Sequence, residues 1–102
     1  MFRNREELQS LLEVLLGSSN VYFQPPSNKQ LNYPAIIYKI SNVDNTHADN
    51  SVYLQFSSYD VVVVDYKPNS QIADKISRLP MCRFNTNYVS NNLNHFSFTL
   101  YY

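Results

Sequence analysis

Apolar residues recur near the start of the chain at intervals of three and four, and this spacing predicts a helix over residues 4–16. Asn4 stands at the position of an N-terminal cap, with Glu7 three residues later as in a capping box. Gly17 follows where a left-handed C-terminal cap belongs. The apolar positions share one helical face, which must pack on another part of the protein: Leu8, Leu11, Leu12, Leu15 and Leu16.

The stretch SYDVVVVDYKPNS, residues 58–70, holds four consecutive valines instead of the alternation expected of a strand with one face in water. Either both faces of this strand are covered within the domain, or a partner covers one of them. The segment 52–66 predicts one long strand, which would span roughly 50 Å at about 3.3 Å per residue. A bulge at Ser57 and Ser58 would divide this strand. Otherwise its first half forms a projecting hairpin arm with the preceding strand.

The remaining elements follow from alternating, β-branched or aromatic segments and from turn residues. A second helix is predicted over residues 70–79, with Ser70 as its N-terminal cap and Pro80 as its stop. The order of elements is α-β-β-β-α-β-β, which predicts an α+β fold: a mainly antiparallel sheet with two helices packed on it, in a single domain of residues 1–102. The other predicted strands are residues 21–24, 34–40, 82–88 and 96–100.

Residues 41–51, SNVDNTHADNS, are almost wholly polar and follow neither the strand period nor the helix period. This pattern predicts a mobile loop. Asp44, His47 and Asp49 within it are residue types that bind divalent metal ions. The loop contains no glycine and has no second anchoring motif, so a solvated polar loop is the better interpretation.

Two other groups contain catalytic residue types. Asp60 and Asp65, with Lys75 downstream, have the composition of a metal-dependent nuclease site, but a spacing of five points the two acids to opposite faces of a regular strand. Cys82 and His95 would need the last two strands to bring them together as nucleophile and base. No nucleophile elbow or oxyanion-hole motif accompanies them, and a small core cysteine is the default. We therefore expect neither enzymatic activity nor a cofactor.

The amino-acid composition further restricts the classes of function that this chain can have. Eight basic and eight acidic residues give a formal net charge of zero, which argues against a general binder of nucleic acid or membrane surfaces. Arg3 and Arg5 suit either a phosphate or acidic partner, or a solvated chain end. Nine tyrosines suit interfaces and strands equally. Cys82 is the single cysteine, and no signal-like or membrane-spanning apolar run is evident, so we expect a soluble protein made in a cytoplasm.

Several stretches of the last two thirds of the chain, from Asn32 to Tyr102, carry a family resemblance. They are YPAIIY, ADN before the long strand ending in YDVVVVD, DYKPNSQIADKISRLP, and NLNHFSFTLYY. Together they resemble the tail terminator, or tail completion, proteins of long-tailed bacteriophages. The resemblance implies an α+β fold and a homo-hexameric ring at the head–tail junction of the virion. Such a ring stops polymerisation of the tail tube protein, and DNA passes through its lumen without specific binding.

The ring's second face would receive the head completion, or connector, protein. Two alternatives stay open: a neck or head completion protein on the head side, and a small host-directed binding protein. None of the three involves a membrane.

In a ring, one helix is expected to cover one face of the valine strand, and the second helix or a neighbouring subunit the other. Loop 41–51 is expected to order on the tube end, or to place its acids in the lumen. The residues assigned to a subunit or tube interface are Asp44, His47, Asp49, Tyr53, Tyr59, Val61, Val63, Tyr66, Tyr101 and Tyr102.

Overall fold

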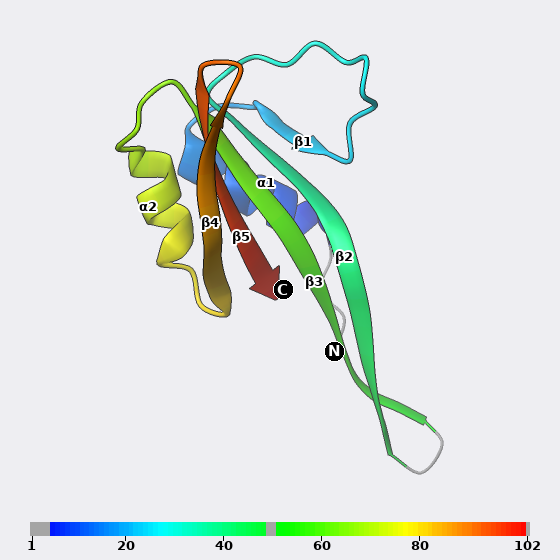
Figure 1. The fold of residues 1–102 in the computed structure, drawn as a ribbon. Helices are drawn as coiled ribbons and strands as arrows, with labels where there is room; N and C mark the ends of the chain where they lie inside the picture. Colours follow the sequence, from blue (N-terminus) through cyan, green and yellow to red (C-terminus); the bar gives the residue numbers. More distant parts are fainter. Residues whose placement is uncertain (1–4, 49–50, 102) are drawn as a thin grey trace.

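The computed structural model describes residues 5–48 and 51–101, with side chains described outside residues 42–57. The described residues form α1 (Arg5–Leu16), β1 (Val21–Phe23), β2 (Ala35–Ala48), β3 (Ser51–Asp65), α2 (Gln71–Ser77), β4 (Cys82–Ser90) and β5 (Leu93–Tyr101). The strands make one sheet in the order β1-β2-β3-β5-β4 (Figure 1). β1 is parallel to β2, and every other neighbouring pair is antiparallel. The predicted α+β fold and element order are confirmed.

The capping residues predicted at the helix ends form the expected hydrogen bonds where the structure describes them. Gly17 ends α1 with φ of +82°, and its N–H donates to the carbonyl of Glu13 at 2.8 Å. Ser70 caps α2, because its hydroxyl oxygen accepts a hydrogen bond from the Ala73 N–H at 3.2 Å. The Asn4 cap lies outside the described residues. The second helix is shorter than predicted and ends at Ser77.

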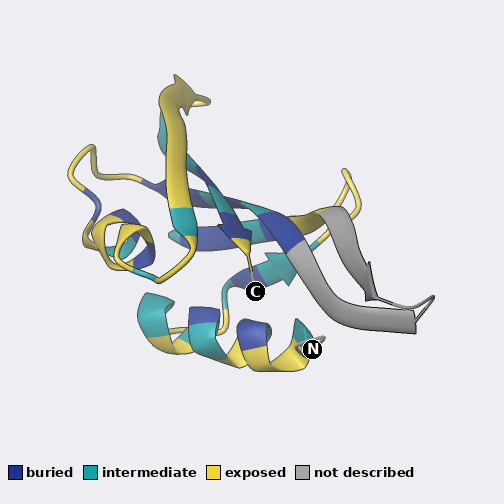
Figure 2. Ribbon diagram, turned by 90° about the horizontal axis from the view of Figure 1, so that it is seen from below, coloured by how far each residue is buried: buried dark blue, intermediate teal, exposed yellow. Residues whose placement is uncertain are grey.

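Both helices lie on the same side of the sheet, and the core fills the space between them and that sheet face (Figure 2). Successive strand residues point to opposite faces, so alternate residues of β3 turn toward the helices. Tyr59, Val61 and Val63 on this face are fully buried. The other core residues are Leu8, Leu12, Val21, Ile36, Tyr38, Ala73, Ile76, Phe98 and Leu100.

The opposite sheet face, here called the outer face, carries no helix of the described chain (Figure 2). At one end of the outer face, Ala35 and Val64 are buried. At its centre the paired residues Ile37 and Val62 are only half-buried. The run of four valines therefore has one face in the chain's own core and one face that is partly open. One of our two alternatives required the second helix to cover the outer face, and α2 does not cover it.

β2 and β3 continue as a pair beyond the ends of their neighbours β1 and β5. Residues 41–48 and 51–57 form a two-stranded ribbon, here called the arm, which projects from the body (Figure 1). The molecule is accordingly elongated, with principal extents of 51 × 27 × 22 Å. The predicted loop over 41–51 is therefore wrong for residues 41–48, and the projecting hairpin is confirmed. A ribbon with no core face needs no hydrophobic alternation, so the polar sequence concealed the strand.

The irregularity predicted at Ser57 and Ser58 lies instead on the partner strand. Ile40 pairs with Tyr59 and Asn42 with Ser58, which leaves Ser41 as the extra residue of a bulge. The Ser41 hydroxyl donates to the Ser58 carbonyl at 3.0 Å and lies 2.8 Å from the Ser58 hydroxyl. These contacts link the bulge to the facing strand at the base of the arm.

Candidate interaction surface

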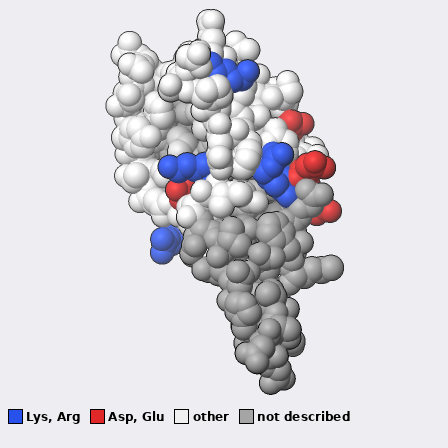
Figure 3. Space-filling view, turned by 90° about the vertical axis from the view of Figure 1, so that its right-hand side faces the viewer, with Lys and Arg blue, Asp and Glu red and all other residues white. Residues whose placement is uncertain are grey.

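An open hollow of about 570 Å³ lies beside β1, where the outer face meets the edge of the sheet. Its lining joins apolar and polar residues: Gln24, Pro25, Ile37, Tyr38, Lys39, Ile40, Asp60 and Val62. Lys39 and Asp60 are direct cross-strand partners on the outer face. Figure 3, which views the β1–β2 side, shows charges of both signs in small separate groups. The described part of this surface therefore combines apolar, polar and charged residues and has no extended area of a single charge sign.

Three of the residues assigned to an interface lie in the core. Tyr59, Val61 and Val63 are fully buried by the chain's own helices and present no surface to a partner. All three are odd-numbered residues of one strand and so share one face, which is the face that the helices cover. The sequence does not reveal on which face the helices pack, and our assignment of these three residues is corrected.

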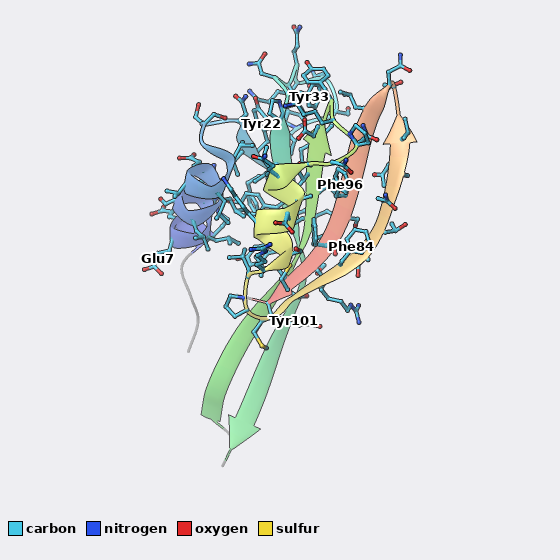
Figure 4. The ribbon with its side chains drawn as sticks, turned by 90° about the vertical axis from the view of Figure 1, so that its left-hand side faces the viewer. Glu7, Tyr22, Tyr33, Phe84, Phe96 and Tyr101 are labelled. Carbon is cyan, nitrogen blue, oxygen red and sulfur yellow. The ribbon has the colours of Figure 1, made fainter. Side chains whose placement is uncertain are left out.

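Two assigned tyrosines are accessible, at opposite ends of the β3–β5 ladder. Tyr66 is 63% exposed, and its ring meets the Tyr33 ring edge-on at a centroid distance of 6.4 Å. Tyr101 is 41% exposed and lies at the lower end of the body, above the arm, in Figure 4. Its N–H donates to the carbonyl of Met81, another exposed apolar residue, at 3.0 Å. These residues keep aromatic and apolar surface available at each end of the sheet.

The remaining assigned residues belong to the arm or to the chain end. Asp44, His47 and Tyr53 lie on strands whose backbone alone is described, and Asp49 and Tyr102 lie outside the described residues. The group Asp44, His47 and Asp49, for which the sequence favoured a solvated polar loop over a metal site, therefore falls on residues whose side chains are not described. Elsewhere in the described part of the chain, no three His, Cys, Asp or Glu residues gather as metal ligands.

Cys82 and His95 are not brought together. Cys82 pairs with Leu100 and His95 pairs with Tyr88, so the two lie five residues apart along the hairpin, about 17 Å at roughly 3.4 Å per residue. Burial raises the pKa of the Cys82 thiol, which disfavours the reactive thiolate. The His95 ring stacks on Tyr88 at a centroid distance of 4.8 Å. This arrangement does not form a nucleophile–base pair.

Asp60 and Asp65 point to opposite faces, as their spacing predicts. Asp60 lies on the outer face between its cross-strand partners Lys39 and Thr99. Asp65 is buried on the helix side and accepts a hydrogen bond from the Lys67 N–H at 3.2 Å. The two carboxylates therefore share no ligand position.

A polar network ties α1 to the sheet. The Arg5 guanidinium lies over the Phe23 ring, 4.4 Å from its centroid, and donates to the Tyr38 hydroxyl at 3.2 Å. The Tyr38 hydroxyl in turn donates to the Gln9 side-chain oxygen, and the Gln9 amide donates to the Val21 carbonyl at 3.0 Å. Burial raises the pKa of Tyr38, and Arg5 partly opposes this shift. Arg5 thus has a packing role inside the chain, whereas Arg3 lies outside the described residues.

β4 is the surface that sequence reasoning missed. Its alternating pattern predicts one buried and one exposed face, yet nearly the whole strand is exposed (Figure 2). Phe84, Tyr88 and Val89 are 50%, 49% and 68% exposed. Phe84 contacts Phe98 at a centroid distance of 5.5 Å, so only its inner side meets the core. Three sizeable apolar side chains on one edge strand are a signal of contact that alternation alone cannot reveal.

Comparisons with protein-family models, with curated proteins and with solved structures find no match to this chain. In the described ranges, neither helix is long and apolar enough to cross a membrane.

Proposed function

We propose that this chain is a virion structural protein that caps the head-proximal end of a phage tail tube as a ring. The ring stops polymerisation of the tube protein and offers its other face to the connector of the head. The motifs between Asn32 and Tyr102 support this proposal. So does the combination of a small α+β body with several exposed surfaces that have no partner within the described chain.

The observation that carries the proposal is the arm. A two-stranded ribbon alone is marginally stable in water, and three strands or a packed face are normally required. The arm extends beyond both β1 and β5, so within the described chain neither of its outer edges has a neighbouring strand. A ring seated on a tube end provides contacts that would hold such an arm. Termination then follows from shape, because the far ring face offers tube subunits no complementary surface.

The outer face and the charge distribution agree with this role. Ile37 and Val62 are half-buried at the centre of the outer face, as expected of a surface that a neighbour completes. The chain has no net charge, and a weakly charged wall retains DNA poorly. A ring built from this chain would therefore let DNA pass through its lumen without specific binding.

The decisive experiment is electron microscopy of particles made by the encoding phage when this chain is not produced. Tails of uncontrolled, excessive length beside unjoined heads are the expected result. Tails of normal length beside finished, separate heads would contradict the proposal and favour a head-side neck or completion protein. Intact infectious particles would reject both virion roles and favour a host-directed binding protein. Complementation with the full chain is the control.

The arm is tested separately by deleting residues 43–50. We expect loss of length control with an unchanged body, since the described residues of the deleted segment belong to the arm, beyond the pairing with β1 and β5. Circular dichroism and thermal unfolding of the purified variant check the fold. Retained length control in complemented particles would show that the arm is not the capping element.

A further inference from the structure

The outer edge of β4 is a long pairing surface whose usual protection is limited to one charged residue, Arg83, and one bulge, at Asn85. β4 runs from Cys82 to Ser90 at the end of the strand order, so only one of its two edges is paired within the described residues. Edge strands commonly avoid association through proline, several charged residues or short length. β4 has nine residues, contains no proline and carries a single charge, Arg83. Its exposed side chains are otherwise aromatic, aliphatic or uncharged polar.

The register shows which backbone groups point outward from this edge. The Tyr101 N–H donates to the Met81 carbonyl, so the odd-numbered residues of β5 direct their backbone groups toward β4. Thr86 pairs with Ser97 and Tyr88 with His95, after a bulge at Asn85. The intervening Asn87, and likewise Val89, therefore direct their N–H and C=O groups away from β5.

A second free edge lies at the other side of the same sheet. β1 pairs only with Ile36–Tyr38, so β2 has no neighbouring strand on that side from Lys39 onward in the described chain. The Gln24 side-chain oxygen accepts from the Ile40 N–H at 3.2 Å, in the place where a strand carbonyl would bond. β2 therefore offers a backbone edge that continues along the arm (Figure 1).

We propose that β4 of one copy pairs with the free edge of β2 of the next copy, so that the sheet continues from subunit to subunit. Strand directions support this partner. β4 runs parallel to β3 and therefore opposite to β2. Two copies in the same orientation, displaced along the strands so that β4 lies beyond β1 of the next copy, bring β4 against β2 as an antiparallel pair, with no inversion of either copy.

Pairing between copies is a heterologous contact, in which two different surfaces meet. Such contacts repeat around a ring. Pairing of β4 with β4 of a second copy would instead close a dimer and leave the β2 edge unpaired in both copies. This inference rests on the proposed ring, and it identifies the contact that would build that ring.

The test compares Asn87→Pro with Asn87→Ala. Proline removes an outward N–H and blocks pairing, whereas alanine removes the same exposed side chain and keeps the N–H. Sedimentation of the purified chains over a concentration series should show loss of oligomers for Asn87→Pro and wild-type assembly for Asn87→Ala. Circular dichroism checks that both variants are folded. Amide exchange at Asn87 and Val89 should slow about tenfold or more when wild-type chains assemble.

Assembly of Asn87→Pro like the wild type, or a wild-type complex that stops at a dimer, would overturn the pairing. So would rings in which the Asn87 and Val89 amides exchange as fast as in the monomer. If the free chain stays monomeric, the two variants are compared in complemented particles, where equal length control by both overturns the pairing. In each of these cases the tail-length result without the chain still decides the proposed function on its own.

Discussion

Val62 and Val63 are neighbours on one strand, and replacing each by alanine tests whether the sheet is covered on one side only. Val63 is fully buried under the helices, whereas Val62 is half-buried on the outer face. Both substitutions remove the same atoms from β3. The difference in strand propensity between valine and alanine therefore affects both variants similarly. The comparison isolates the environment on each face.

The expected magnitudes follow from burial. Each substitution removes two methyl groups, worth about 1.6 kcal/mol at roughly 0.8 kcal/mol per buried group. At Val63 the cavity left under the helices raises the cost to about 2–3 kcal/mol. At Val62 the lost burial is partial and solvent fills the space, so we expect about 0.5–1 kcal/mol. For a domain of this size each kcal/mol lowers Tm by about 4–8 °C.

The assay is urea and thermal unfolding at concentrations where the chain is monomeric, followed by circular dichroism. A shared urea slope would show that the compactness of both states is unchanged. Equal losses of free energy, or a larger loss for Val62→Ala, would refute the one-sided core. A Val62 cost that rises only when chains assemble would place the outer face in a subunit contact.

Three further predictions concern named hydrogen bonds and one thiol. Tyr38→Phe should lower the unfolding free energy by about 1–2 kcal/mol. Because burial raises the Tyr38 pKa above its ordinary 10.0, the contribution of Tyr38 to wild-type stability should be complete below about pH 10 and fall above it. Calorimetry should show a smaller fall of stability in the variant. Ser70→Ala should lower the unfolding free energy by about 1 kcal/mol, with Ser70→Asp close to wild type, and equal losses would contradict the cap. Cys82 in the native chain should react several-fold more slowly with iodoacetamide at pH 8 than in the unfolded chain, because its pKa is raised, and equal rates would contradict its burial.

Local signals predicted the body of the fold well. The leucine stripe of α1, the Gly17 cap and the Ser70 cap are each read from a few adjacent residues, and each is confirmed. The boundaries of the other strands agree within a few residues, because turn residues mark them, whereas β2 continues to Ala48, eight residues beyond its predicted end. The length of the segment 52–66 also led to a projecting hairpin as one of two alternatives.

The contact surface was predicted less well, because it depends on tertiary placement. Periodicity groups Val61 with Val63 on one face but does not state which face the helices cover. The exposure of β4 was missed for the same reason. The sequence of an alternating strand does not show whether that strand lies at a sheet edge or over a core. The strand over residues 41–48 was missed for a different reason. Its pairing with β3 is made by the backbone, so its side chains need not alternate between apolar and polar.

The direction of the strands has a consequence for the two faces of the proposed ring. Copies that pair β4 with β2 share one orientation, so every arm points toward the same ring face. The opposite face carries the other end of each sheet, where Tyr33 meets Tyr66 and where Asn91 and Asn92 turn the last hairpin with positive φ. The two ring faces are then chemically different without any second protein. A cap needs this difference, since one face must bind tube subunits and the other must refuse them while accepting the head.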